Sequence, residues 1–477
     1  MKTKKTLRQK TGSLLFVLLV TVAAYLCFYK LGVASLENWD ESWYADMVKN
    51  MLRTGDYIAT VFNRHILLDK PPMFIWFGVF FSKLFGLSEF SVRFVSGLAG
   101  FLTIVMACRY AWKRWGTVAM FFCFGTLALN NVFIWRTRTA NIDALATFFI
   151  FASFIAVMQK SNKKYIWLGI IFACAYLTKA SLAYFPLVLI ASGEILYEFK
   201  HLLRRFGWYL LMIAIPVIIC GFWLHTGDMQ IGGRFSEYYL YHSDQNVAHI
   251  TKENFKTDYI MFTYYSLQRR FTYLLVFGLV FLLWKWKKKE SFLLVGFSLA
   301  LLFMLSFTER KNNWYLMPSM PFWSLVIGYA AQKIADFFKK YPLIIAAFVL
   351  VSFYLFIKTL RVNIMPIVNT SSTRFQAESS KYVKAHSGYD EIVIRMDEMY
   401  PTSIYYTDRK VLSFSVDSAI SDFFIGWKDL SEMLGKKQIR WFIGNKDKAV
   451  TFAREFLKDY PYTTVFKNDE EVVFLLR

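Results

Sequence analysis

Long apolar segments separated by short polar gaps fill about the first 360 residues of the chain. The apolar runs begin near residue 13, and at roughly 17–20 residues each they are long enough to cross about 30 Å of hydrocarbon. A window of roughly 19 residues gives about eleven candidate spans. They are 13–30, 91–108, 117–135, 139–158, 165–178, 181–197, 208–225, 271–284, 291–307, 314–331 and 342–360. This pattern predicts a polytopic α-helical membrane protein.

Two apolar stretches need separate treatment. The first run follows the basic segment "MKTKKTLRQKT" but lacks a small-x-small cleavage site, so we expect a retained helix rather than a signal peptide. The stretch 73–86, "MFIWFGVFFSKLFG", is only about 14 residues long and carries Lys83. It is typical of an interfacial or re-entrant helix, and we predict that it does not span.

The distribution of charge predicts the topology. The chain has 56 Lys and Arg against 34 Asp and Glu, a net charge of +22, and 56% of its residues are hydrophobic. The basic residues gather in the N-terminus and in the gaps 109–116, 159–164, 200–205, 285–289 and 332–340. Basic gaps of this kind mark the cytoplasmic side, which explains the charge better than nucleic-acid binding does. The external gaps are then 31–90, 136–138, 179–180, 226–270, 308–313 and the tail.

The first external gap opens with two carboxylates. Asp40 and Glu41 begin the segment 38–52, which has the periodicity of an amphipathic helix with Tyr44 on the face of Asp40. Asn38 and Glu41 match a capping box. The alternative for Asp40 is that it is itself the helix cap.

Two further groups of charged residues lie at the membrane surface or at a predicted span end. Asp69 and Lys70 stand directly before a Pro-Pro pair, and a lysine that snorkels to the interface is the alternative there. Arg136 and Arg138 occupy a short turn before Asp143, which lies about one turn into the next span. Ionisable residues at membrane depth pair with one another or mark a substrate path, so an Arg138–Asp143 ion pair is the alternative reading.

Cations also recur at the ends of later spans. Lys179 lies between two apolar runs, and Lys311 precedes an aromatic segment that contains Tyr315. Tyr315 has the alternative of an ordinary interfacial aromatic residue. Cations at a lipid interface suit a phosphate group, and a carboxylate suits proton abstraction.

The chain changes character near residue 361. Short β-rich runs such as "EIVIRM", "SIYYT", "VLSFSV", "IRWFIG", "TTVF" and "EVVFLL" alternate with helical patterns at 376–385, 427–435 and 446–458. We therefore predict a membrane domain over 1–360, with external loops 31–90 and 226–270, and a small α/β extracytoplasmic domain over 361–477.

Several of these stretches together resemble integral-membrane GT-C glycosyltransferases, in particular the bacterial lipid A aminoarabinose transferases and the protein O-mannosyltransferases. The motifs occur in the order Asp40-Glu41-x-x-Tyr44-Ala45, Gly55-Asp56, Asp69-Lys70-Pro71-Pro72, Ser88-Glu89-Phe90-x-x-Arg93, Asp143, Leu177-Thr178-Lys179 and Lys311-x-x-x-Tyr315-x-x-Pro318. The resemblance covers roughly residues 10–330. It implies transfer of a sugar from a polyprenyl-phosphate carrier to a glycolipid, glycan or protein outside the bacterial cytoplasmic membrane.

The resemblance also implies roles for residues. Asp40 matches the family's catalytic aspartate, which is a general base for a hydroxyl acceptor in an inverting reaction and orients the substrates when the acceptor is a phosphate. Asp143 matches a second acidic position. The implied donor-phosphate ligands are Lys70, Lys179, Lys311, Arg136 and Arg138. The implied donor or acceptor contacts are Glu41, Tyr44 and Tyr315.

Two points remain open in the comparison with the family. The family often has Glu where this chain has Asp69, and a divalent metal can sit near that acid with a loop histidine, for which His242 and His249 are the candidates. No cofactor is otherwise required. A flippase or transporter of lipid-linked sugars is the alternative function, but transporters favour charges at mid-depth and internal repeats, whereas these charges gather at one face.

Overall fold

The computed structural model describes residues 2–242, 255–309 and 311–477, and the chain divides into two compact units. The first unit comprises residues 1–31, 68–74 and 94–369, and the second comprises residues 32–67, 75–93 and 370–477. The loop that follows the first helix therefore belongs to the same compact unit as the C-terminal segment.

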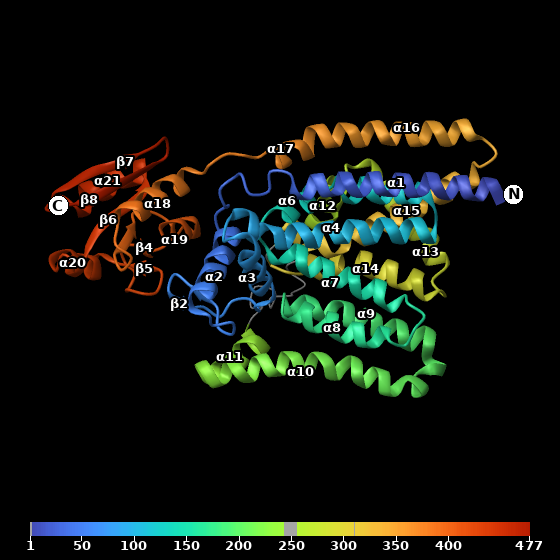
Figure 1. Cartoon of the computed structure of the whole chain (residues 1–477), viewed down its shortest axis with the longest axis horizontal. Coiled ribbons are helices and arrows are strands. Elements are labelled where there is room, and N and C mark those ends of the chain that lie inside the picture. Colours follow the sequence, from blue (N-terminus) through green and yellow to red (C-terminus); the bar gives the residue numbers. More distant parts are fainter. Residues whose placement is uncertain (1, 243–254, 310) are drawn as a thin grey trace. The chain divides into compact units, whose positions relative to one another are not determined.

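The first unit is a bundle of helices, and most of its long helices run side by side (Figure 1). Its first helices are α1 (Lys2–Phe28), α4 (Glu89–Arg114), α5 (Thr117–Leu127), α6 (Asn131–Arg138), α7 (Ile142–Val157), α8 (Lys164–Tyr176), α9 (Ala180–Glu198) and α10 (Phe206–Ile231). Its later helices are α11 (Arg234–Glu237), α12 (Asp258–Ser266), α13 (Arg270–Trp284), α14 (Lys289–Ser306), α15 (Met320–Phe337), α16 (Pro342–Thr359) and α17 (Met365–Val368). The short helical turns are η1 (Phe199–His201), η2 (Leu203–Arg205), η3 (Tyr238–His242), η5 (Asn313–Ser319) and η6 (Leu360–Ile364).

Each of the predicted apolar spans coincides with a helix or with a pair of helices, but not all of these are long enough to cross a membrane alone. Within the described residues, six helices pass on length and composition, or up to eight if each bent pair is one span. The bent pairs are α5 with α6, at 67°, and α12 with α13, at 109°. The chain is thus a multi-pass helical membrane protein, and the total of about eleven spans stays a prediction.

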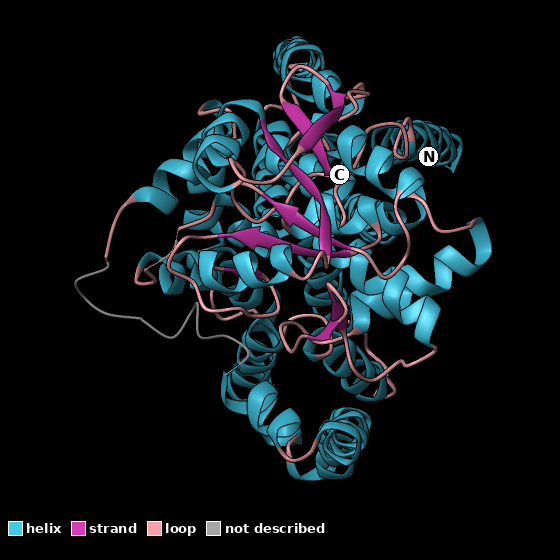
Figure 2. Ribbon diagram, turned by 90° about the vertical axis from the view of Figure 1, so that its left-hand side faces the viewer, coloured by secondary structure: helices cyan, strands magenta, loops and turns pink. Residues whose placement is uncertain are grey.

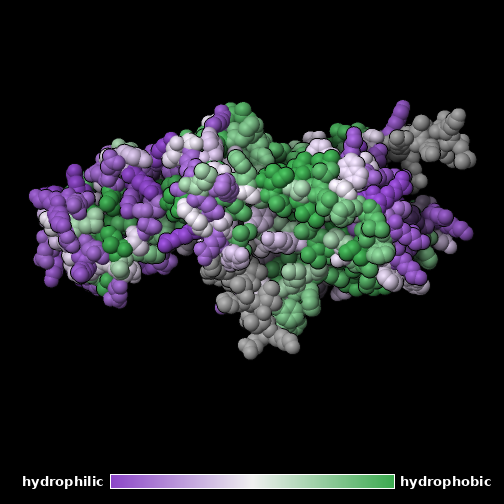
Figure 3. Space-filling view, turned by 90° about the horizontal axis from the view of Figure 1, so that it is seen from below, coloured by the Kyte–Doolittle hydropathy of each residue, from purple (hydrophilic) through white to green (hydrophobic). Residues whose placement is uncertain are grey.

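The surface of the helical unit agrees with a lipid environment. The face seen in Figure 3 carries a broad hydrophobic surface over the helices, with hydrophilic residues gathered at the end where the N-terminus lies. In the interior, Gly328 of α15 allows the backbone of α5 to come close, because a Cβ at this position would lie 2.5 Å from the carbonyl oxygen of Ala119.

The second unit contains the helices α2 (Asp40–Thr54) and α3 (Met73–Phe85), of which α3 begins within the first unit, and a six-stranded sheet, whose strands are visible in Figure 2. The strand order is β5-β4-β3-β6-β8-β7, with β3, β4, β5 and β6 parallel and β7 and β8 antiparallel to their neighbours. The strands are β3 (Ile392–Arg395), β4 (Lys410–Phe414), β5 (Phe424–Ile425), β6 (Ile439–Asn445), β7 (Tyr462–Lys467) and β8 (Glu471–Leu476). The accompanying helices are α18 (Phe375–His386), α19 (Pro401–Thr407), α20 (Trp427–Gly435) and α21 (Lys446–Phe456), and a short hairpin pairs β1 (Val61–Phe62) with β2 (His65–Ile66).

One element of the C-terminal segment differs from the prediction. The β-branched and aromatic content of the stretch "SIYYT" predicts a strand, but the stretch lies in the helix α19. Pro401 stands at the start of α19, a position that proline favours, and Asp408 ends it in the left-handed conformation at φ 54°. Every residue of α19 is buried, so tertiary packing has overridden the local β propensity.

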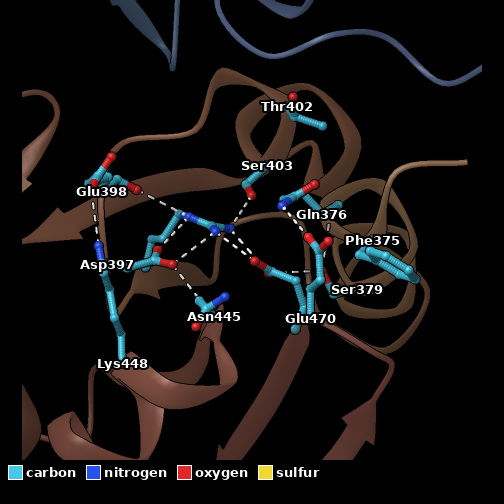
Figure 4. A network of polar contacts seen from close by, with 12 residues as sticks. Phe375, Gln376, Ser379, Asp397, Glu398, Thr402, Ser403, Asn445, Lys448 and Glu470 are labelled. Atoms are coloured by element: carbon cyan, nitrogen blue, oxygen red, sulfur yellow. Dashed lines mark hydrogen bonds and ion pairs between the residues drawn. The ribbon is translucent and has the colours of Figure 1, made fainter.

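A buried arginine in β3 connects this strand to β8 and to α19. The guanidinium of Arg395 is fully buried and forms ion pairs with Asp397, at 2.7 Å, and with Glu471, at 2.8 Å. It also donates to the hydroxyl of Ser403 at 2.7 Å, and Figure 4 shows the surrounding polar network. Because the charge is paired and hydrogen bonded on several sides, its burial is compensated.

Candidate functional site

Asp143, at the start of α7, is held between two cations in the helical unit. Its Oδ2 accepts hydrogen bonds from Nε of Arg136, at 3.1 Å, and from Nη2 of the same side chain. Its Oδ1 lies 3.2 Å from Nζ of Lys179. All three side chains are largely buried. The structure therefore brings together three of the residues that the sequence analysis gives as candidate site residues.

A single amide side chain shapes the turn that makes this possible. Asn141 caps α7, since its Oδ1 accepts from the backbone N–H of Asp143 at 2.9 Å and of Ala144 at 3.3 Å. Its Nδ2 donates to the carbonyl oxygens of Arg136, at 2.6 Å, and Thr139, at 2.7 Å. The end of α6 and the start of α7 are thereby locked, and Arg136 faces Asp143.

Aromatic rings surround the two cations. The guanidinium of Arg136 lies 5.3 Å from the ring centre of Trp135 and 5.2 Å from that of Trp314, and Nζ of Lys179 lies 4.9 Å from that of Tyr315. Such cation–π contacts stabilise positive charge in partly desolvated surroundings. We call Trp135, Arg136, Asp143, Lys179, Trp314 and Tyr315 the Asp143 cluster. Its formal charge is +1, which suits a further anion.

The segment that follows Asp69 and Lys70 forms a backbone hydrogen bond with the segment that precedes Lys179. Nζ of Lys70 lies 3.0 Å from Oδ1 of Asp69. Three residues further on, the backbone N–H of Met73 donates to the carbonyl oxygen of Leu177 at 2.9 Å, and Leu177 lies two residues before Lys179. Two loops that are a hundred residues apart in the chain are thus in direct contact.

Lys311 is anchored by backbone carbonyls rather than by a carboxylate in the described residues. Its Nζ donates to the carbonyl oxygens of Ser306, at 3.0 Å, and Thr308, at 2.7 Å, and lies 5.7 Å from the ring centre of Tyr259. Burial lowers the pKa of Lys311. The side chain precedes Tyr315 of the Asp143 cluster by four residues in the chain.

Arg138 has a different environment from Arg136. Its guanidinium donates to the carbonyl oxygens of Leu26 and Tyr29, each at 2.8 Å, and of Val368, at 3.0 Å. It therefore ties the end of α1 and α17 to α6. The alternative of an Arg138–Asp143 ion pair is wrong, because Arg136 occupies that place. The predicted contact of Arg138 with donor phosphate stays a prediction.

In the second unit, Asp40 is the first residue of α2 and is partly exposed. The residue before it, Trp39, has φ 62° and ψ −118°, a strained backbone for a residue with a side chain. The predicted capping box is absent, because Asn38 instead accepts from the N–H and hydroxyl of Thr402, at 3.4 and 3.3 Å. Tyr44, one turn further along α2, is buried.

Glu41 forms a buried ion pair with Arg93. Its two oxygens accept from Nε and Nη2 of Arg93, both at 2.8 Å, and one also accepts from the backbone N–H of Glu37 at 2.7 Å. The same guanidinium donates to the carbonyl oxygens of Ala34 and Ser35. This arrangement gives Glu41 a structural partner, and its predicted contact with donor or acceptor stays a prediction.

The helix α2 is further tied to the C-terminal segment through charged side chains. Nζ of Lys49 lies 2.8 Å from Asp46 and 3.1 Å from Asp408, and it donates to the carbonyl oxygen of Tyr405 at 2.9 Å. Arg53 forks onto Asp408 at 2.7 and 2.8 Å. Burial would raise the pKa of Asp408, but the charge of Lys49 and the hydrogen bonds from Arg53 and Lys49 outweigh it and bring it to about 2.

The predicted metal site cannot be assembled from the described part of the chain. There, no three His, Cys, Asp or Glu side chains are grouped so as to hold an ion, and Asp69 is paired with Lys70. His249 and the side chain of His242 lie outside the described residues.

Sequence reasoning missed several residues that build this site. Trp135 and Trp314 flank Arg136, and Asn141 fixes the turn. An available signal was the position of each tryptophan next to a nominated residue in "FIWRTR" and "NNWYLM". For Asn141, the available signal was its place directly before a predicted span.

Comparison with known proteins shows which proteins this chain resembles. The family model described as dolichyl-phosphate-mannose-protein mannosyltransferase matches residues 69–224. In fold, the chain is similar to ArnT from Cupriavidus metallidurans bound to undecaprenyl phosphate, with a TM-score of 0.74 at 16% identity over 96% of this chain and 97% of that one. It is also similar to the oligosaccharyltransferase AglB of Archaeoglobus fulgidus, with a TM-score of 0.56 at 11% identity over 90% and 69% of the two chains. At these identities the likeness shows the fold.

Sequence relatives point the same way. An uncharacterised protein of Aquifex aeolicus is 29% identical over 65% of this chain and 62% of its own length. An undecaprenyl phosphate-alpha-4-amino-4-deoxy-L-arabinose arabinosyl transferase of Shewanella sediminis is 28% identical over 40% of this chain and 36% of its own. The chain thus covers less than two thirds of the length of either relative. The predicted resemblance to GT-C glycosyltransferases of the aminoarabinose and protein mannosyl transferase kind is confirmed.

Proposed function

We propose that this protein transfers a sugar from a polyprenyl-phosphate carrier to a glycolipid, glycan or protein on the external face of the bacterial cytoplasmic membrane. The relatives named above include one enzyme whose name specifies an undecaprenyl-phosphate sugar, which supports this class of donor. The Asp143 cluster is the observation that carries the proposal, because it gathers two buried cations at the ends of apolar helices.

The chemistry of the cluster suits a phosphate leaving group. Breaking the bond between the anomeric carbon and the phosphate oxygen leaves an extra negative charge on the polyprenyl phosphate. Preorganised cations near that oxygen stabilise the transition state without having to reorganise, and a low dielectric strengthens the effect. In our proposal Arg136 and Lys179 supply this charge, Asp143 holds both cations in position, and Lys70 and Lys311 add to the binding of the phosphate.

Asp40 acts on the acceptor in this proposal. For a hydroxyl acceptor, the acceptor oxygen attacks the anomeric carbon from the face opposite the phosphate, and its proton passes to the carboxylate of Asp40. The bonding electrons of the broken bond leave with the phosphate, so the sugar is transferred with inversion. An acceptor that is already an anionic phosphate needs no base, and Asp40 then orients the reactants.

The replacement Lys179→Met tests the role of the cluster. It keeps the side-chain length and leaves Asp143 paired with Arg136, so the cluster keeps its ion pair while losing one cation. With polyprenyl-phosphate sugar supplied to membranes, we expect kcat/KM for the donor to fall at least tenfold, which is a loss of at least about 1.4 kcal/mol. Lys163→Met is the matched control, since Lys163 is exposed at another helix end. Equal activity of the two variants would refute the assignment.

The acceptor is found by comparing cells with and without the gene. Mass spectrometry of envelope lipids, glycans and proteins should reveal one class that loses a sugar residue when the gene is deleted. Transport of a lipid-linked sugar across vesicles, with no change in any acceptor, would instead support the flippase or transporter.

A further inference from the structure

A polar cavity of about 290 Å³ lies among the helix ends of the first unit, away from the Asp143 cluster in the chain. The end of α4, the segment between α13 and α14, and the last turns of α15 form its walls. Its charged lining consists of Arg114, Lys285, Lys288, Glu290, Lys333 and Asp336. None of these residues takes part in the proposed transfer reaction.

The cavity carries an excess of positive charge. Arg114 forks onto Glu290 with distances of 2.8 and 2.7 Å, and so these two charges cancel. Asp336 lies 3.9 Å from Nζ of Lys333. Lys285 donates only to a tyrosine hydroxyl, at 3.4 Å, and neither it nor Lys288 has a carboxylate within 4.0 Å in the part of the chain that the structure describes. The charges of Lys285 and Lys288 are therefore available to bind an added anion.

The surroundings place the cavity at the depth of lipid headgroups. Trp284 and Trp286 flank Lys285 and are 85% and 57% exposed, as aromatic side chains at a membrane–water interface are. In Figure 1 the end of α13 and the loop between α15 and α16 lie at the end of the bundle that also holds the N-terminus. Hydrophilic residues gather at this end in Figure 3.

We propose that this cavity binds the phosphate group of an anionic membrane phospholipid. A phosphate diester carries one negative charge that is shared by two non-bridging oxygens, and these oxygens suit the two lysines on one wall and the lysine on the other. Basic pockets between membrane helices are suited to such headgroups. The site is independent of the sugar transfer proposed above. A bound headgroup would hold together the end of α4, the end of α13, the start of α14 and the end of α15.

The double variant Lys285→Met/Lys288→Met tests this site. Full-length protein is reconstituted in nanodiscs with phosphatidylglycerol in phosphatidylcholine, and the lipid retained after extraction into detergent is counted by native mass spectrometry. We expect the wild type to retain phosphatidylglycerol and the double variant to lose at least tenfold in affinity. The control is Lys339→Met/Lys340→Met, which removes the same charge from the α15–α16 loop outside the cavity and should retain the lipid.

Two results would overturn the proposal. Equal loss of lipid in both double variants would mean that diffuse surface charge, not the cavity, attracts the lipid. If inorganic phosphate raises the Tm of the protein as much as phosphatidylglycerol does, the ligand is a soluble anion and not a lipid. If Lys285→Met/Lys288→Met does not fold, Lys333→Met from the opposite wall serves instead, and retention of the lipid by that folded variant contradicts the site.

Discussion

Removing the charge of Glu41 should lower the stability of the protein more than removing the charge of its neighbour Asp40. Glu41 is buried against Arg93, with two hydrogen bonds of 2.8 Å, so Glu41→Gln removes the charge while keeping the shape. The guanidinium of Arg93 is then left in a buried site without its counter-charge. Asp40 is only partly buried, so we expect Asp40→Asn to cost less stability than Glu41→Gln.

The size of the effect follows from the pairing. Breaking a buried ion pair by removing one partner costs about 3–5 kcal/mol, but Gln still accepts one hydrogen bond, and the carbonyls of Ala34 and Ser35 continue to solvate Arg93. We therefore expect a loss of about 3 kcal/mol for Glu41→Gln. At roughly 2–4 °C per kcal/mol for a unit of this size, the apparent Tm should fall by about 6–12 °C.

Thermal unfolding of the purified variants in detergent, followed by tryptophan fluorescence at one scan rate, measures this difference. Asp40→Asn should unfold at a temperature closer to that of the wild type than Glu41→Gln does, and on the function proposed above it should lose transfer to a hydroxyl acceptor. Arg93→Met combined with Glu41→Gln should recover part of the stability, because no charge is then left buried. An unchanged Tm for Glu41→Gln, or an equal fall for Asp40→Asn, would refute this division of roles.

Two other predictions concern stability. The pKa of Asp408 is lowered from 3.8 to about 2 in the folded protein. The stabilisation that its carboxylate gives to the folded state is therefore fully present above pH 4 and is lost as the pH falls towards 2. The shift corresponds to at most about 2.4 kcal/mol, and to roughly half of that after solvent screening. The Tm difference between wild type and Asp408→Asn should therefore narrow between pH 5 and pH 3, and a constant difference would contradict the ion-pair explanation. Gly328→Ala should destabilise the helical bundle by about 1–3 kcal/mol, because its Cβ would meet the carbonyl oxygen of Ala119 at 2.5 Å. Thermal unfolding measures this effect, and Gly221→Ala, which meets no atom within 4 Å, is the control.

The sequence predicted the helices well because each apolar run is long and has polar limits. It also predicted most of the β-strands, which are short runs of apolar and β-branched residues, but it did not predict α19, where the same residue types are buried in a helix. The two-residue strand β5 is too short to leave a pattern.

The pairing of charges was harder to predict than their positions. Arg136 and Arg138 stand two residues apart, and only the turn fixed by Asn141 decides that Arg136 reaches Asp143. Arg138 points instead at carbonyl oxygens of residues 26, 29 and 368, contacts that depend on tertiary packing. Likewise Glu41 has its partner 52 residues away, so a local capping rule assigned it to the wrong neighbour.

The contacts of α2 with α19 have a consequence for how the protein is made. Lys49 and Arg53 hold Asp408, which the ribosome adds more than 350 residues later. The loop that carries Asp40 therefore lacks its folding partner during most of synthesis and membrane insertion. A nascent chain, or one truncated before residue 408, should therefore contain inserted helices while α2 still lacks these contacts.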